Sequence, residues 1–311
     1  MIRAARTVAL AVVFGVATAS AAPEEAAAPS VWKVGQTFAV TVEANETIAV
    51  SHDDGTPLVI AKIDERRAFA IVVDRIDDAG QPVCSLTFTR MAINVVSDGV
   101  VTETDYDSGD AKKATLPRTE GVLERVRLFQ ALAGRKVTVT LSPQGTCASV
   151  TNVGSVADAV VRGLPDGVGI GGWDLMRLNG RLATELRRGW ARDCVVLPAT
   201  RAKGATSVAT SVFDVLYGNA VVTDAFEVAE ATDGAITLAR TARADRFDGN
   251  PGMKGTVRSV TRESTIRIEG NHPLRFDAPK DRVTIELAFG AAGGPSVKIE
   301  RTAKVRSRLV E

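Results

Sequence analysis

The sequence predicts a β-rich α+β fold: one curved antiparallel sheet, half-barrel-like, with two or three central helices. Aromatic residues make up only 5% of the chain, while Val, Ala and Thr are frequent, and this bias suits a pleated sheet packed with β-branched side chains. Short alternating stretches recur between turn residues such as Asp77-Asp78-Ala79-Gly80, which is typical of a meander. In the last stretches apolar residues alternate with Arg, Lys, Glu and Thr, so one face of the sheet should be solvated.

Residues 1–21 have the layout of a secretory signal peptide. Arg3 and Arg6 precede an apolar stretch, residues 7–18, that is too short to span a bilayer comfortably. Small residues then lead to an expected cleavage after Ala21. An uncleaved anchor is the alternative interpretation.

The mature chain is therefore expected to be periplasmic or secreted, with no integral membrane segment after cleavage. The first cysteine is Cys84, so the leader lacks the cysteine of a lipobox. Residues 22–30 are rich in Ala, Pro and Glu and predict a disordered spacer. Residues 31–311 predict a single large β-rich domain, with a hint of two pseudo-repeated halves joined by helices at 155–190.

The charges of the chain are nearly balanced, at 38 basic and 37 acidic residues. Loss of Arg3 and Arg6 with the leader would leave 36 basic residues against 37 acidic ones. Such a balance provides no general field for nucleic acid or an anionic membrane, so nucleic acid is not an expected partner.

The first third of the chain predicts strands followed by a helix. Phe38, Val40 and Val42 alternate with small or polar residues, as a half-buried strand requires. The predicted strands are 34–50, 67–75, 83–96 and 100–106. Residues 120–134 then predict a helix that ends at Gly134.

A hairpin within residues 128–153 is the clearest local signal in the chain. Val137, Val139 and Leu141 alternate with polar residues, and the Ser142-Pro143-Gln144-Gly145 sequence predicts the turn. A second helix is expected over 156–162, with Ser155 as its N-cap.

Residues 173–190 predict the best amphipathic helix. Its apolar stripe provides the candidate ligand-binding residues, namely Leu175, Leu178, Leu182 and Leu186. A stripe of this kind usually packs on a core, and packing on the sheet is the favoured interpretation. A basic helix at a membrane surface is the alternative.

Strands resume after Leu197-Pro198. The predicted segments are 208–217, 220–229, 235–243, 255–262, 264–269, 281–289 and 296–309. Turn residues separate them, and their rhythm indicates an antiparallel meander.

Three cysteines are present, Cys84, Cys147 and Cys194. Export would permit one disulfide, and the preferred pair is Cys84 with Cys147 because both lie in predicted strands. Three buried free thiols are the alternative.

No catalytic motif, metal site or cofactor site stands out. His52 and His272 are the two histidines, and neither accompanies a known catalytic motif. The glycine-rich stretch 167–172 lacks the Lys-Ser/Thr of a phosphate loop. A cation at His52, Asp53 and Asp54 is disfavoured because the spacing of a calcium loop is absent. Carboxylates brought together by folding would remain invisible in the sequence.

The chain resembles an uncharacterised family of exported bacterial β-rich proteins. The matching features are Tyr106-Asp107-Ser108, Leu128 to Gly134, Val137 to Leu141, Ser142-Pro143-Gln144-Gly145, the helix leading to Leu197-Pro198, and Phe276 with Asp277. This resemblance implies no activity. More loosely, the arrangement is similar to the lipoprotein-carrier half-barrels of the bacterial envelope, which implies an apolar concave face and a lipid or other apolar ligand.

The resulting hypothesis is an exported envelope protein that binds an apolar ligand or a protein partner without catalysis. A purely structural or interaction protein is the first alternative. A hydrolase with non-local carboxylates is the second.

Overall fold

The computed structural model describes residues 31–52, 56–97, 101–110, 120–163, 172–215, 218–249, 254–289 and 295–310. Val31–Glu311 forms one compact unit. The predicted signal peptide (1–21) and spacer (22–30) lie outside the described residues.

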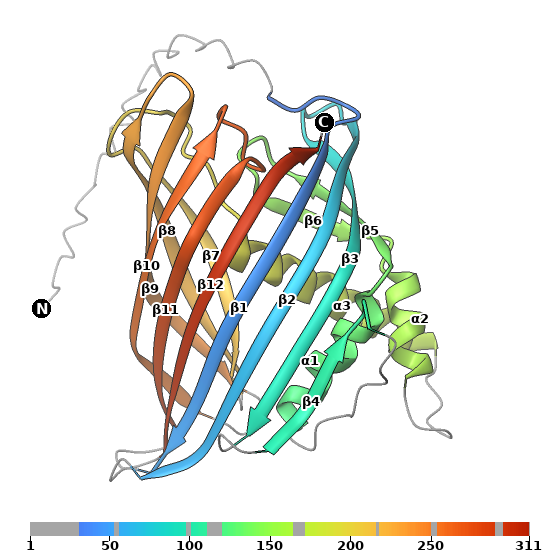
Figure 1. Cartoon of the computed structure of the whole chain (residues 1–311), viewed down its shortest axis with the longest axis vertical. Helices are drawn as coiled ribbons and strands as arrows, with labels where there is room; N and C mark the ends of the chain where they lie inside the picture. Colours follow the sequence, from blue (N-terminus) through green and yellow to red (C-terminus); the bar gives the residue numbers. More distant parts are fainter. Residues whose placement is uncertain are drawn as a thin grey trace, which may run out of the picture. The chain divides into compact units, whose positions relative to one another are not determined.

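One antiparallel sheet contains the twelve strands of the described chain. They are β1 (Thr37–Ser51), β2 (Pro57–Ile76), β3 (Pro82–Ser97), β4 (Val101–Asp107), β5 (Lys136–Leu141), β6 (Cys147–Thr151), β7 (Thr206–Val215), β8 (Gly218–Ala231), β9 (Ala235–Gly249), β10 (Gly255–Glu269), β11 (Phe276–Phe289) and β12 (Ser296–Val310). Their order is β6-β5-β3-β2-β1-β12-β11-β10-β9-β8-β7, with β4 paired to β3. The first strand thus pairs with the last (Figure 1), and the open, curved sheet confirms the predicted fold class.

Alternation along each strand decides which face becomes the core. In β1 the side chains of Phe38, Val40 and Val42 are buried, while Ala39 and Thr41 between them are exposed. The same period-2 pattern runs through the paired strand β12. The inner face is therefore mainly apolar, and the outer face carries the polar side chains.

Several predicted strand boundaries are wrong, as at the start of β11 and the end of β9, and two further cases have a physical reason. The predicted strands 255–262 and 264–269 form one strand, β10, whose pairing with β11 shifts register within it. Strand β2 begins at Pro57, ten residues before the predicted start. The charged run Lys62–Arg67 resembled a loop by composition, although Ile63 and Glu65 are buried at alternate positions. A charged residue at an inward position breaks the apolar alternation by which a strand is predicted.

The three helices of the described chain are α1 (Glu120–Leu132), α2 (Gly154–Arg162) and α3 (Gly172–Asp193). Helix α3 packs against both β6 and β7, the two end strands of the sheet. It therefore bridges the opening between the sheet's ends (Figure 1), while α2 packs against α1 and α3. None of these helices combines the length and apolar character needed to cross a bilayer.

The expected cap of α2 is wrong. The helix begins at Gly154, and its N-cap is Val153, which makes no side-chain capping hydrogen bond. Ser155 thus lies inside the helix, where its hydroxyl is past the capping position.

The predicted β5–β6 turn is confirmed, and it also holds α3. Gly145 adopts φ +95°, and a Cβ at this position would lie 2.6 Å from the Cβ of Pro273, so both the backbone angle and the space favour glycine. Its carbonyl accepts a hydrogen bond from the Trp190 indole (3.0 Å), and the Gln144 carbonyl accepts one from the Leu197 amide (3.0 Å).

The preferred Cys84–Cys147 disulfide is not formed, and Cys84, Cys147 and Cys194 are buried free thiols. Cys84 is in β3 and Cys147 is in β6, with β5 between these strands. Two strand spacings, roughly 10 Å, exceed the reach of a disulfide at about 7 Å between Cα atoms. Burial raises the pKa of Cys84 to about 12 and that of Cys147 to about 11.

Candidate functional site

A belt of charged side chains interrupts the apolar inner face of the sheet. We call these residues the polar belt: Glu46, Glu65, Arg67, Asp224, Arg240, Arg262, Asp281 and Arg301. Neighbouring strands align them, as where Arg301 on β12 lies opposite Glu46 on β1. Buried charges require partners, and the contacts of this belt therefore decide what the interior can do.

Asp193, the last residue of α3, is the centre of one half of the belt. Its carboxylate accepts hydrogen bonds from Arg67 and Arg301, each at 2.7 Å. Arg192 lies further away, with its Nε 3.7 Å from Asp193 Oδ1. Two strands far apart in the sequence, β2 and β12, thereby hold the end of one helix.

Arg125 connects α1 to the same cluster. Its guanidinium donates to Glu46, with Nη1 2.9 Å from Oε1, and to Glu65. Arg67 also approaches Glu65, at 3.5 Å. The four guanidinium groups of Arg67, Arg125, Arg192 and Arg301 and the carboxylates of Glu46, Glu65 and Asp193 form what we call the Asp193 cluster.

The other half of the belt caps the C-terminus of α3. Arg240 donates to the carbonyls of Ala191 and Arg192, each at 3.1 Å, and Arg262 donates to the Arg192 carbonyl at 2.9 Å. These carbonyls have no partner within the helix, and cations are favourable at this end of a helix dipole. The strands thus hold α3 by its backbone as well as by Asp193.

Asp224 and Asp281 balance the two capping arginines. Arg262 donates to Asp224 and Asp281 at 2.9 Å each, and Arg240 donates to Asp224 at 2.9 Å. Ser211 donates a further hydrogen bond to Asp224. In this half two carboxylates match two guanidinium groups.

Two carboxylates of the Asp193 cluster, those of Glu65 and Asp193, remain ionised far below neutral pH. Burial by itself would raise the pKa of Glu65, but Arg125 and Arg67 lower it to about 2. Burial likewise acts against ionisation of Asp193, and Arg67, Arg301 and Arg192 reverse this and hold its pKa well below the usual range. Both groups are therefore permanent negative charges under ordinary conditions.

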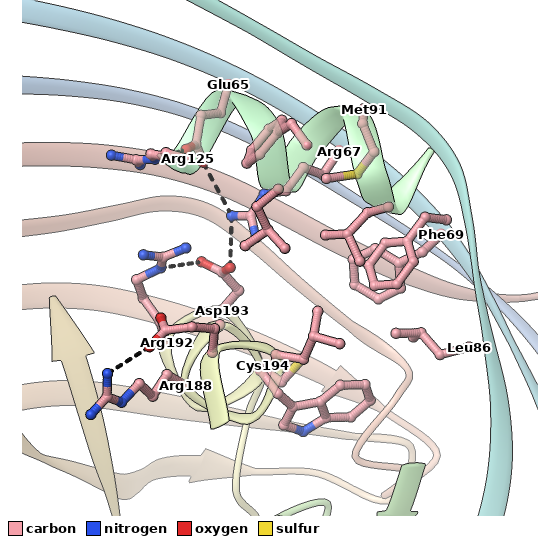
Figure 2. Close-up of a pocket in the computed structure, with 18 of the residues that line it drawn as sticks. Glu65, Arg67, Phe69, Leu86, Met91, Arg125, Arg188, Arg192, Asp193 and Cys194 are labelled. Carbon is pink, nitrogen blue, oxygen red and sulfur yellow. Dashed lines mark hydrogen bonds and ion pairs between the residues drawn. The ribbon is translucent and has the colours of Figure 1, made fainter. Parts of the chain in front are cut away.

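A cavity of about 100 Å³ adjoins this cluster. Figure 2 shows Arg67, Arg125, Arg188 and Arg192 on one side of it and Phe69, Leu86 and Met91 on the other side. The lining comes from β2, β3, β7, α1 and the last turns of α3, and Trp190 is part of it. A water needs roughly 10–15 Å³ of such volume, so there is room for several waters or for part of a small ligand. We call this the amphipathic pocket.

Two guanidinium groups of the pocket have unused hydrogen-bond donors. Within the described residues, the buried Nε atoms of Arg67 and Arg192 have no hydrogen-bond partner. Unpaired buried donors cost free energy, and these two belong to residues that line a cavity. The polar side of the pocket therefore contains guanidinium groups that are incompletely paired.

The candidate leucines of α3 have different surroundings. Leu182 is buried, and Leu178 and Leu186 are partly buried against the core. Leu186 also lines the amphipathic pocket. The side chain of Leu175 lies outside the described residues. The three described leucines thus face the core, and among them Leu186 reaches a cavity.

The sequence reading missed the charged part of the pocket, although a signal was present. In β12 the side chains of Ile299, Arg301 and Ala303 are all buried, and their spacing of two residues puts the arginine in phase with the apolar positions. Glu46 has the same phase in β1, between Ala44 and Ile48. An ionisable residue at an inward position predicts a buried partner.

His272 is buried and does not belong to a catalytic group. Its ring packs on Trp32 and Phe38, with centroids 4.4 and 4.6 Å apart, and Nδ1 accepts a hydrogen bond from the Leu274 amide at 3.1 Å. Burial, with a smaller contribution from Arg275, lowers its pKa to about 4. His52 is exposed, and Asp53 and Asp54 lie outside the described residues.

His272 should make the protein sensitive to acid. Its pKa falls from 6.5 when unfolded to about 4 when folded, so the unfolded state binds more protons and stability is lost as pH falls through this window. We expect a loss of about 2 kcal/mol between about pH 7 and pH 4.5 from this group. Urea unfolding across this range should show a flatter profile for His272→Asn, which retains an acceptor near Nδ1. His52→Asn is the control, and an equal slope in all three proteins would contradict the assignment.

Within the described residues, no group of three His, Cys, Asp or Glu side chains is placed to hold a metal ion. A hydrolase would need a carboxylate that acts as a general acid. Two carboxylates of the Asp193 cluster line the pocket, those of Glu65 and Asp193, and each has a lowered pKa. A general acid needs a pKa raised toward the working pH. Neither Glu65 nor Asp193 therefore has the raised pKa of a general acid.

Comparison with known proteins identifies no family. No protein-family profile and no curated protein matches the chain. Among solved structures, OccK7 (OpdD) of Pseudomonas aeruginosa is 6% identical with a TM-score of 0.25, covering 89% of this chain and 100% of its own. The outer membrane protein opdK of Pseudomonas aeruginosa is 7% identical with a TM-score of 0.14, covering 88% and 99%. Scores this low support no inference about function.

Proposed function

We propose that this is an exported bacterial envelope protein that binds a small ligand with an apolar portion in the amphipathic pocket, without chemical conversion. The observation that carries the proposal is the cavity itself, which joins an apolar wall to hydrogen-bond donors. Ligand sites commonly combine an apolar lining with a few polar groups of this kind. Export follows from the leader-like residues 1–21 and is part of the proposal.

The resemblance to lipoprotein-carrier half-barrels fits the same proposal in a restricted form. Helix α3 and the core side chains fill much of the concave face, and the cavity that remains is about 100 Å³. A short chain, or the head and first carbons of a longer one, matches this space better than a complete lipid does.

Uptake of a fluorescent fatty acid by delipidated protein tests the proposal. Binding that a non-fluorescent octanoate displaces is the expected result, and Trp190 in the pocket wall provides a second signal through its emission. If millimolar octanoate neither displaces the fluorescent fatty acid nor changes the Trp190 emission, the proposal of ligand binding is wrong and the structural alternative is favoured.

Leu186→Gln should weaken this binding by about tenfold, because a polar side chain would replace part of the apolar wall. Titration of the fluorescent fatty acid measures the change. Met176→Gln is the matched control on the same helix, since Met176 is 67% exposed. Equal loss of affinity in both variants would place the ligand elsewhere.

A further inference from the structure

The Asp193 cluster contains one more positive charge than negative charge. Among the described residues that its contacts join, four guanidinium groups face three carboxylates. Arg188, which also lines the pocket, pairs with Glu185 at 2.7 Å and adds no net charge. The polar side of the pocket is therefore a largely buried site with a surplus cation.

Arg192 is the guanidinium that the cluster uses least. Arg67, Arg125 and Arg301 each have a carboxylate oxygen within 2.9 Å. Arg192 makes a longer ion pair, with its Nε 3.7 Å from Asp193 Oδ1, and this Nε has no hydrogen-bond partner among the described residues. The side chain is nevertheless only 12% exposed, so water compensates its charge incompletely.

The position of this cation suits a ligand's head group. Arg192 and Arg67 both line the amphipathic pocket, and the Nε of each is unpaired. An oxyanion bound beside these two guanidinium groups would neutralise the surplus charge, and charge-assisted hydrogen bonds are the stronger class. The apolar wall at Phe69 and Leu86 lies on the other side of the same cavity (Figure 2).

We propose that the pocket selects ligands that carry a single negative charge, with a carboxylate bound between Arg192 and Arg67 and an aliphatic portion against Phe69 and Leu86. The inference rests on the proposed binding function and assigns its ligand class. One surplus guanidinium balances a monoanion, whereas a dianionic phosphate would leave an excess buried negative charge. Arg192 is the residue that determines this specificity.

Octanoate and 1-octanol test the charge requirement, because they share a chain and differ in the head group. With the full chain at neutral pH, isothermal titration should give octanoate at least about tenfold tighter binding than octanol. Arg192→Met should reduce this ratio to about one by weakening octanoate alone, and Arg192→Lys should keep part of it. Octyl phosphate should bind more weakly than octanoate in the wild type.

Arg177→Met is the control, because Arg177 is exposed on the same helix. The capping contacts of Arg192 use its backbone carbonyl, so the side-chain variant should unfold at a similar urea concentration. Equal binding of octanoate and octanol to the wild type would overturn this inference and leave the binding function standing. If neither octanoate nor octanol binds, both the proposed binding function and the proposed preference for a monoanion are wrong. If Arg192→Met still binds octanoate at least about tenfold more tightly than octanol, Arg192 does not determine the specificity.

Discussion

Asp193→Asn is expected to lower the free energy of unfolding by about 3–5 kcal/mol, the usual cost of leaving a buried charge without its partner. The substitution keeps the shape of the side chain and removes the negative charge that Arg67 and Arg301 share. Both guanidinium groups come from the sheet, and Arg301 is fully buried. The expected result is a large decrease in the urea midpoint with little change in the slope of the transition.

Asp158→Asn is the control for this experiment, because Asp158 is exposed on α2 and its loss should change stability by less than about 0.5 kcal/mol. Adding Arg301→Met to Asp193→Asn should recover part of the loss, since it removes one uncompensated charge. A small effect of Asp193→Asn, similar to that of the control, would show that Asp193 does not hold the end of α3.

Local patterning was sufficient to predict most elements of the sheet. The alternation of Phe38, Val40 and Val42 is a property of neighbouring residues, and it predicted β1 correctly. The turn at Gly145 was equally local, because Pro-Gln-Gly specifies a reversal whatever it packs against. Prediction failed where inward charges occur, as in the early part of β2, because a charged residue on a strand usually faces solvent.

The pocket could not be predicted because its chemistry depends on pairings across the whole chain. Arg67 and Asp193 are 126 residues apart, and Arg301 and Asp193 are 108 residues apart. The strand phase can indicate that Arg301 points inward, but only the order of strands brings β2 and β12 around the end of α3. The leucine stripe of α3 is a local pattern, so it could be predicted from the sequence. The surplus charge of Arg192 depends on pairings between distant residues, so it could not.

The two halves of the polar belt have different consequences. Around Asp224 and Asp281 the charges match, and the arginines there also cap α3, so this half has no surplus charge for a ligand to balance. Around Asp193 the charges do not match, and a cavity adjoins the unmatched group. Substitution of a closely paired arginine or carboxylate in either half should therefore affect folding, while substitution of Arg192 should affect ligand binding with little effect on folding.

Arg262→Met is the second substitution for which we expect a large effect, a loss of about 3–5 kcal/mol at neutral pH. Arg262 is fully buried and donates to Asp224, to Asp281 and to the Arg192 carbonyl. Methionine fills similar space without a charge, so two buried carboxylates would have to share Arg240. Urea unfolding measures the loss, and Arg258→Met, at an exposed position of the same strand, is the control.

The loss from Arg262→Met should depend on pH in a direction that the structure determines. In the wild type, burial would raise the pKa of Asp281, but Arg262 and Arg240 lower it below 3.8, so this group contributes stability above that pH. Without Arg262 the desolvation of Asp281 is less compensated, and its folded pKa should rise. The variant should then lose stability as pH rises above about 4, because the unfolded chain ionises more readily than the folded one. The difference from the wild type should therefore be largest near neutral pH and smaller in acid, and a difference that grows in acid would contradict the assigned role of Arg262.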